Sequence, residues 1–453
     1  MKSVLILSAL LLGAAVSPGA PTVAPLEDAR RLEVLFLGAP TANHPAHDPV
    51  ERYRVVRKHL GVSGINFTYT ENLADLKPEV LNHYDAVMLY GNWASITPEQ
   101  EKSLVEYVES GHGFLPIHCA SACFEKSESY GKLVGGHFKS HGTGVFRTTI
   151  VAPEHPVMKG YKDFETWDET YVHDRLTSDR TLLQKREEEP WTWVRTQGKG
   201  RIFYTAYGHD MRCWNQPEFN DLLRRGILWS VNDATRAKLY ALKLPKLEME
   251  KMELPGYKER KLNTEGQKPL SQEESMKLAQ VPNGFELSLF AAEPDIINPI
   301  YVNWDARGRA FVVQTVDYPN NLQAKNLGHD SIKICEDTNG DGKADKFTVF
   351  ADHLNIPTGF TFARGGIVVS QSPRFLFLKD TDGDDKADVR TEIMTGWGIN
   401  DTHAQANNLH YGLDNWLYGA GGYSGFKGTI GGVEKQFAQG TYRFKADGSA
   451  LEF

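Results

Sequence analysis

The sequence predicts two domains, an α/β domain built on a parallel sheet and an all-β domain after it. From Leu32 to about Asp233, short apolar runs alternate with helical segments, a pattern typical of a parallel sheet covered by helices on both faces. After Pro282 the chain consists of short strand-like runs separated by Gly, Asp and Asn. The length of 453 residues also favours two or three domains.

The chain begins with the features of an export signal. Met1-Lys2 precede an uncharged apolar run from Val4 to Val16, and small residues and prolines follow that run. The run is shorter than the ~20 apolar residues that a spanning helix needs. We therefore expect a signal peptide over residues 1–22, a periplasmic or secreted protein, and no transmembrane helix after the signal is removed.

Charge and cysteine content exclude several classes of protein. The net charge of −8 provides no basic face for nucleic acid, so we expect no nucleic-acid partner. The four cysteines are too few and too scattered for a disulfide scaffold. Neither C-x-x-C nor C-x-x-C-H occurs, so the chain carries no haem motif.

The strands expected in the first domain have the near-continuous apolar character of strands buried on both faces. They cover residues 32–37, 65–70, 86–90, 114–117 and 201–207. A helix is expected between the third and fourth strands, because Thr97 can cap it, Pro98 suits its first position and Gln100 completes a capping box. Gly111 ends this helix, and residues 217–231 predict a closing amphipathic helix.

Histidines and carboxylates follow the expected strands. Ligands of open α/β sheets sit beyond the carboxyl ends of the strands. The candidates there are His44 and His47 after the first strand, His118 after the fourth, His209 after residues 201–207, and His137, His141, Asp168, Glu169 and Tyr171 in between. A lone histidine is usually a structural residue, but several at strand ends indicate a site for a metal or for proton transfer.

Several of these segments resemble one known family. Gly111-His-Gly-Phe-Leu-Pro-Ile-His118, Leu133-Val-Gly-Gly-His137 and Gly208-His209 are similar in order and spacing to the ThuA-like (trehalose utilisation) family, over roughly residues 32–233. The resemblance implies the flavodoxin-like fold of class I glutamine amidotransferases. It also implies a role in disaccharide or keto-sugar metabolism, and hence a small-molecule carbohydrate as partner.

The resemblance suggests roles for the site residues. His118, His141, Glu169 and His209 are expected to converge as catalytic acid/base groups or as ligands of a divalent metal, with His44, Asp168 and Tyr171 binding the substrate. Cys119 stands at the elbow where amidotransferases carry a nucleophile, yet the G-x-C-x-G pattern is absent. A nucleophilic thiol and a buried structural thiol are the two readings, and the second is favoured.

The domain boundaries follow from composition. We expect the α/β domain over residues 30–234 and a charged linker over 235–270, which is rich in Lys, Glu, Leu and Pro. The all-β domain is expected over 271–453. Within it, a capping box formed by Ser271 and Glu274 predicts a short helix that ends at Ala279.

Two similar loops indicate a repeat in the second domain. Asp337-Thr-Asn-Gly-Asp-Gly-Lys-Ala-Asp345 recurs as Asp380-Thr-Asp-Gly-Asp-Asp-Lys-Ala-Asp388, an interval of 43 residues (380 minus 337). Four-stranded propeller blades have periods of about 40–50 residues. The ~170 residues after Pro282 hold about three or four blades, so we expect an incomplete β-propeller.

This segment resembles the propeller of membrane-bound dehydrogenases related to quinoprotein glucose dehydrogenases, through Pro282-Asn-Gly-Phe-Glu-Leu287 and Asn407–Tyr418. Full members of that group continue into helical repeats and a haem-binding segment. The resemblance therefore implies further C-terminal domains or a separate electron acceptor as partners. It also marks His403 as a candidate catalytic residue, with a hydrogen-bonded structural histidine as the favoured alternative.

The repeated loops space oxygen ligands as a calcium loop does. The candidate ligands are Asp337, Asn339, Asp341, Asp345, Asp380, Asp382, Asp384 and Asp388. Thr348 replaces the bidentate Glu that would complete the first loop, and Asp385 replaces the glycine of the second. Calcium binding and a plain aspartate-capped hairpin turn fit each loop equally well.

Two functions remain open at this point. The chain is either an exported enzyme of carbohydrate metabolism, a sugar hydrolase or lyase or a component of an oxidoreductase, or a non-catalytic carbohydrate-binding or scaffolding protein whose histidines are structural.

Overall fold

The computed structural model describes residues 29–252, 265–319 and 322–453. The expected signal peptide lies outside the described residues. The chain divides into two compact units. The first runs up to Glu248 and includes Gln267–Glu286, and the second holds Met249–Gly266 and Leu287–Phe453.

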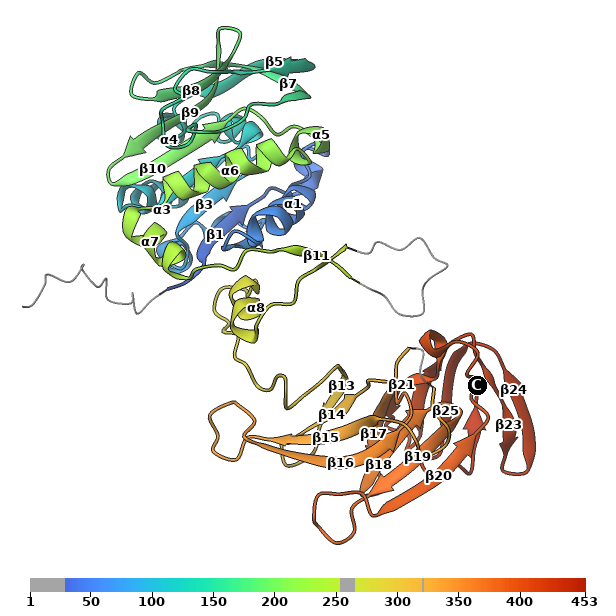
Figure 1. The fold of residues 1–453 in the computed structure, drawn as a ribbon. Coiled ribbons are helices and arrows are strands. Elements are labelled where there is room, and N and C mark those ends of the chain that lie inside the picture. The colour runs from blue at the N-terminus through green and yellow to red at the C-terminus, as the bar shows by residue number, and fades with distance from the viewer. Residues whose placement is uncertain (1–28, 253–264, 320–321) are drawn as a thin grey trace, which may run out of the picture. The chain divides into compact units, whose positions relative to one another are not determined.

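The first unit is built on an eight-stranded sheet of order β2-β1-β3-β4-β10-β9-β8-β6 (Figure 1). Its parallel strands are β1 (Leu32–Leu37), β2 (Ile65–Thr70), β3 (Ala86–Leu89), β4 (Gly113–Pro116) and β10 (Gly200–Thr205). The order 2-1-3-4 followed by β10 is the doubly wound order of flavodoxin-like folds. The parallel strands expected from the sequence are confirmed to within two residues at their ends.

The antiparallel part of this unit was not predicted. β6 (Thr149–Ile150), β8 (Thr181–Arg186) and β9 (Glu189–Gln197) extend the sheet beyond β10. β5 (His137–Arg147) and β7 (Glu165–Asp174) form a separate antiparallel pair. Because β5 is mostly exposed and polar, it lacks the apolar run by which the buried strands are recognised.

Helices cover both faces of the sheet. The long ones are α1 (Pro49–Gly61), α3 (Pro98–Glu109), α6 (Pro217–Ser230) and α7 (Asp233–Ala241), and the short ones are α2 (Pro78–Leu81), α4 (Glu128–Val134) and α5 (Met211–Trp214). Two 3₁₀ turns, η1 (Thr41–Asn43) and η2 (Leu73–Asp75), follow β1 and β2. The predicted capping box of α3 is present, with Thr97 Oγ1 accepting from the Gln100 amide.

The expected linker is divided between the two units, with residues 235–248 and 267–270 in the first and Met249–Gly266 in the second. α7 occupies its start, and a two-stranded pair, β11 (Met249–Lys251) with β12 (Glu265–Gln267), follows. α8 (Gln272–Leu278) has the expected capping box. α8 was expected in the second domain, but it groups with the first unit, where Arg31 donates to the Lys277 carbonyl.

The second unit consists of antiparallel sheets. Three have four strands each: β13 (Pro299–Trp304), β14 (Ala310–Gln314), β15 (Asp330–Glu336), β16 (Lys346–Leu354); β17 (Gly359–Ala363), β18 (Gly366–Gln371), β19 (Arg374–Lys379), β20 (Val389–Thr395); and β21 (Asn407–Tyr411), β22 (Leu417–Gly421), β25 (Gly440–Phe444), β26 (Leu451–Glu452). A hairpin of β23 (Phe426–Ile430) and β24 (Val433–Phe437) accompanies the third sheet, and η4 (Thr402–Ala404) precedes it.

Apolar side chains join consecutive sheets of this unit. On β18, Ile367 and Val369 belong to a core shared with Phe311 and Ile334 of the first sheet. Val368, which points the other way, belongs to a core shared with Leu409 of the third sheet. The two repeated loops connect the third and fourth strands of the first and second sheets. The described residues show these sheets without a closed ring, so the partial propeller stays a prediction.

No helix within the described ranges is both long enough and apolar enough to cross a membrane.

Candidate metal centre of the first unit

His118 occupies a strained position directly after β4. It begins the 3₁₀ helix η3 (His118–Ala122) and has φ of 50°, a left-handed conformation that costs a non-glycine residue about 1–2 kcal/mol. Such strain gathers at functional sites, where the surrounding structure enforces it. The residue with the strained backbone at this elbow is therefore His118 and not Cys119.

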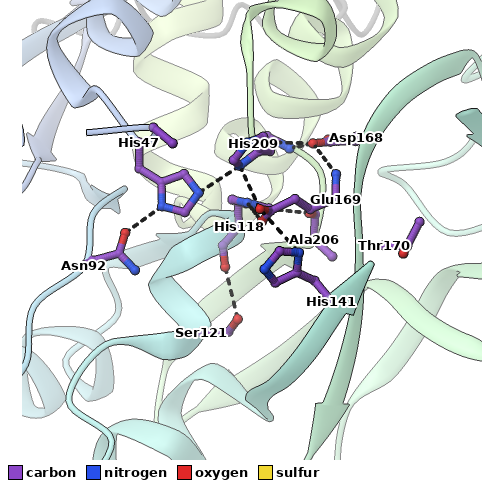
Figure 2. Close-up of polar contacts among 12 residues, drawn as sticks. His47, Asn92, His118, Ser121, His141, Asp168, Glu169, Thr170, Ala206 and His209 are labelled. Atoms are coloured by element: carbon purple, nitrogen blue, oxygen red, sulfur yellow. Dashed lines mark hydrogen bonds and ion pairs between the residues drawn. The ribbon is translucent and has the colours of Figure 1, made fainter. Parts of the chain in front are cut away.

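Three histidines and a glutamate meet beyond the carboxyl edge of the sheet (Figure 2). His47, His118, Glu169 and His209 each offer one ligand atom, and these atoms all lie within 4.8 Å of one another. His47 stands just before α1, His209 follows β10, and Glu169 comes from β7. The cluster is formed by segments that are far apart in the sequence.

Glu169 is the centre of the cluster. Its Oε2 lies 3.3 Å from His118 Nε2, and its Oε1 lies 3.2 Å from His209 Nδ1. The same Oε1 lies 3.4 Å from His141 Nδ1, and His47 Nε2 lies 3.0 Å from His209 Nδ1. As the sequence predicts, His118, His141, Glu169 and His209 converge.

Hydrogen bonds on the outer side fix two of the rings. His47 Nδ1 donates to Asn92 Oδ1 at 2.7 Å, and His118 Nδ1 donates to the Ala206 carbonyl at 2.7 Å. With the proton on Nδ1, the lone pair of each ring is on Nε2, which points into the cluster. His118 Nε2 is buried and makes no hydrogen bond. Rings oriented in this way are typical of metal-ligating histidines.

The charges within the cluster are strongly coupled. Burial favours a neutral Glu169, but His118 and His209 beside it outweigh burial and hold its pKa well below the usual range. Burial works against a charged His209, yet the Glu169 carboxylate raises the pKa of that ring. Burial, reinforced by His118, lowers the pKa of His47 to about 2. His47 is therefore neutral at neutral pH and available as a ligand.

Asp168 and Tyr171, which are predicted to bind the substrate, are both buried and in contact with the protein. The Asp168 carboxylate is fully buried and accepts from the amides of Gly208 and His209 at 2.8 and 2.9 Å. Tyr171 is also buried and stacks on the His118 ring at 4.2 Å. These contacts place Asp168 under the turn that carries His209 and Tyr171 against the His118 ring.

Two histidines at the margin of the cluster reach solvent. The His141 side chain is 42% exposed. His44 is exposed and stacks on His47, with the ring centroids 4.2 Å apart. These two side chains can contact a ligand that enters from solvent.

Cys119 has the surroundings of a structural thiol. It is fully buried, and burial raises the pKa of the thiol well above its ordinary value. A reactive cysteine needs the opposite, a lowered pKa and partial exposure. The favoured reading of Cys119 is thus supported.

The sequence marks His47 as a candidate after the first strand without giving it a role, and it does not mark Asn92 or Arg52. Arg52 on α1 donates to the His209 carbonyl at 2.7 Å and so steadies the turn that carries this ligand. The signal that marks His47, its position after a strand, is the same signal that marks His118. Nothing in the sequence around Asn92 identifies it as a partner of a histidine 45 residues away.

The candidate residues of the second unit form separate sites. Asp337 accepts from the amides of Gly340 and Gly342, and Asp380 accepts from that of Gly383, as aspartate-capped turns do. Oxygens of Asp380, Asp382 and Asp384 lie within 4.8 Å of one another. The other candidates also accept hydrogen bonds within their own loops. Asn339 accepts from the Asp341 amide, Asp341 from the Lys343 amide and Asp384 from the Lys386 amide. Asp345 and Asp388 accept from the Thr338 and Thr381 hydroxyls.

His403 is exposed. Its Nδ1 lies 2.8 Å from Asp401 Oδ1, which is the hydrogen-bonded arrangement of the structural alternative. In the described ranges, no other candidate catalytic residue contacts His403.

Comparisons with known proteins distinguish the two units. Residues 33–230 match the family model described as trehalose utilisation (ThuA), and residues 271–453 match a domain of unknown function, DUF7133. A search of the curated proteins finds no match. The dehydrogenase resemblance of the second unit is therefore without support from a characterised family.

Several solved structures are similar to part of this chain. A ThuA-like protein of Parabacteroides merdae is 19% identical, over 44% of this chain and 90% of that chain, with a TM-score of 0.39. A ThuA-like protein of Bacteroides uniformis is 18% identical, over 46% of this chain and 95% of that chain, also with a TM-score of 0.39. A β-galactosidase of Bacillus circulans is 11% identical, over 45% and 32%, with a TM-score of 0.35.

The matched segment contains the parallel sheet and all four residues of the histidine and glutamate cluster. Residues 33–230 of this chain are a ThuA-like domain.

Proposed function

We propose that the ThuA-like domain binds one divalent transition-metal ion through His47, His118, His209 and Glu169, and acts there on a sugar as a hydrolase or lyase. The observation that carries the proposal is the convergence of four donor atoms within 4.8 Å in a buried place. Imidazole nitrogens with one carboxylate oxygen are a donor set that suits Zn²⁺ and other first-row divalent metals.

The orientation of the donors supports a cation between them. His118 Nε2 and Glu169 Oε2 lie 3.3 Å apart, and the Nδ1 proton of His118 is already used by the Ala206 carbonyl. Two lone pairs therefore face each other in a buried site unless a proton or a metal ion joins them. A metal would satisfy the inward donors of all four residues together.

A bound metal of this kind polarises a sugar oxygen or lowers the pKa of a water molecule. The residues supply the rest of the chemistry. His141 borders the cluster, is half-exposed and can move a proton to or from a substrate oxygen. Exposed His44 is placed to contact the sugar, while buried Tyr171 keeps the His118 ring in position.

The substrate class and location rest on sequence. The trehalose-utilisation family supports a disaccharide or keto-sugar as substrate. The apolar run from Val4 to Val16 supports export, and hence a periplasmic or secreted protein.

For the second unit we propose a partial β-propeller of dehydrogenase type. Three four-stranded antiparallel sheets with apolar cores between consecutive sheets, and the 43-residue interval between the repeated loops, support the propeller. The dehydrogenase assignment is supported only by the sequence resemblance.

Metal content and turnover test the proposal for the first unit. The full chain should retain about one divalent metal per molecule after dialysis and should turn over trehalose, a glucoside or a 3-keto derivative of these. His118→Ala should abolish both properties. His59→Ala, an exposed histidine on α1, is the matched control and should change neither. A wild-type chain that binds the sugar without turnover would support the non-catalytic alternative.

A further inference from the structure

A second polar hollow lies at the other end of β10 from the histidine cluster. It has a volume of about 560 Å³ and is lined by Arg201, Arg224, Arg225 and Arg236 together with Trp229 and Tyr240. Arg201 stands near the start of β10, and the others come from α6 and α7, which follow each other in Figure 1. His209 follows the opposite end of β10, so the two sites are separate.

The hollow has more arginines than carboxylates to neutralise them. Arg224 and Arg225 share the Asp221 carboxylate, at 2.6 Å each. Arg201 and Arg236 share Asp233 Oδ1, at 3.2 and 2.6 Å. Four guanidinium groups and two carboxylates leave two positive charges, in a chain whose net charge is −8. This local surplus attracts an anion.

The guanidinium groups are already held in place. Arg201 donates to the Trp229 carbonyl at 3.1 Å and Arg236 to the Leu228 carbonyl at 2.7 Å, which satisfies the carbonyl end of α6. Arg225 donates to the Lys159 carbonyl at 2.8 Å. These contacts explain why the arginines are ordered but do not neutralise their charge. An anion that binds here meets donors whose entropy is already reduced.

Aromatic rings border the charged groups. The Arg201 guanidinium lies 5.7 Å from the centre of the Trp229 ring. The centres of the His155 and Trp229 rings are 5.5 Å apart. Tyr240 is 62% exposed. Pro156 also lines the hollow, so the His155-Pro156 segment, which has no part in the histidine cluster, belongs here. Rings beside a cationic pocket suit an anion that is attached to an organic ring.

We propose that this hollow binds the oxyanion of a small ligand of monosaccharide size, a sugar phosphate in the simplest case. Guanidinium groups match phosphate oxygens with paired, charge-assisted hydrogen bonds. The volume accommodates a phosphate and one sugar ring, with the ring against Trp229 and Tyr240.

Calorimetric titration of the full chain with glucose 6-phosphate, inorganic phosphate and glucose tests the proposal. Glucose 6-phosphate should bind at least about tenfold more tightly than inorganic phosphate, and glucose should not bind, because both the anion and the ring contribute. Absence of glucose 6-phosphate binding at about 10 mM would overturn the proposal. Equal affinity for glucose 6-phosphate and inorganic phosphate would show that the Trp229 and Tyr240 rings do not contribute to binding.

Single substitutions locate the site. Arg224→Gln should weaken glucose 6-phosphate binding about tenfold or more, because Arg224 contacts only Asp221 among the described partners and its loss removes one charge from the hollow. Arg54→Gln is the matched control, since Arg54 on α1 pairs with Glu51 at the same spacing of three residues. Binding that both variants reduce equally, or that neither reduces, would contradict the assignment to this hollow. His118→Ala should leave this binding unchanged, which separates it from the metal centre.

Discussion

The two places where this chain gathers possible metal ligands are built in opposite ways. In the first unit, four donors from distant segments meet in a buried place, and one of their inward atoms, His118 Nε2, is buried without a hydrogen bond. In the second unit, the carboxylates of each loop come from one short segment, are largely exposed, and accept hydrogen bonds from their own backbone. The metal proposed for the first arrangement would bridge its buried donors, whereas the second arrangement makes the hydrogen bonds of a turn by itself.

The comparison shows that spacing in sequence is a weak guide to a metal site. The aspartate loops have the regular spacing of a calcium loop, and that spacing also suits a hairpin turn. The four residues of the histidine cluster have no regular spacing at all, and only the edge of the sheet brings them together.

The largest expected effect is the loss of metal binding when a ligand of the first unit is removed. Glu169→Gln should lower Zn²⁺ affinity at least about 100-fold, because the central carboxylate is lost while the histidines remain. Asp382→Asn, a change of the same kind in the exposed loop, should leave Zn²⁺ affinity unchanged. Titration of both variants with Zn²⁺ measures this, and equal losses would show that the contrast between the regions is false.

Acid should destabilise the metal-free first unit. Burial lowers the pKa of His47 to about 2 and that of His173 to about 3, so below about pH 6.5 the unfolded chain takes up two protons that the folded chain does not. The free energy of unfolding should therefore fall as pH falls, by about 3 kcal/mol between pH 6.5 and pH 5. His209, whose pKa is raised, opposes this in part.

Urea unfolding at several pH values measures the effect, with His59→Ala as a control whose pH slope should match the wild type. A stability that rises on acidification would show that these rings are protonated in the folded chain.

A smaller effect is expected from the positioning carboxylate. Asp168→Asn replaces an acceptor oxygen by an amide donor that faces a backbone N–H of Gly208 or His209. The turn that carries His209 should shift and Zn²⁺ affinity should fall about tenfold, with one ion per chain still bound. An unchanged affinity would mean that Asp168 contributes to stability alone.

The smallest effect concerns the aspartate loops. If they bind calcium, a tenfold excess of Ca²⁺ over its Kd should stabilise the second unit by about 1.4 kcal/mol and raise its Tm, and Asp382→Asn should reduce that shift. Calorimetric scans of the full chain with Ca²⁺ and with a chelator measure this. Identical scans would leave the hairpin turn as the whole role of these loops.

Sequence patterns predicted what depends on local structure. The apolar runs gave the parallel strands, the capping residues gave the starts of α3 and α8, and position at strand ends gave His118 and His209. The 43-residue interval marked equivalent hairpins in consecutive sheets. Asp385, which replaces the glycine of the calcium-loop pattern, adopts a left-handed conformation, with φ of 66°.

What depends on tertiary contacts could not be predicted. Asp168 and Glu169 are neighbours of the same type, yet one is buried under a turn and the other faces three histidines, because alternate residues of β7 point to opposite sides. No local pattern separates these two roles. β5, which is mostly exposed and polar, likewise lacked the apolar run on which strand prediction depends.

The span of chain that separates the ligands has a consequence for synthesis. His47 and His209 touch at 3.0 Å although 162 positions separate them. A growing polypeptide cannot bring these rings together until β10 and the turn after it have been made and the sheet has closed, and contacts of such long range form late. The metal ion proposed for the histidine cluster could therefore bind only after most of the domain has folded. It would stabilise the folded domain without taking part in nucleation.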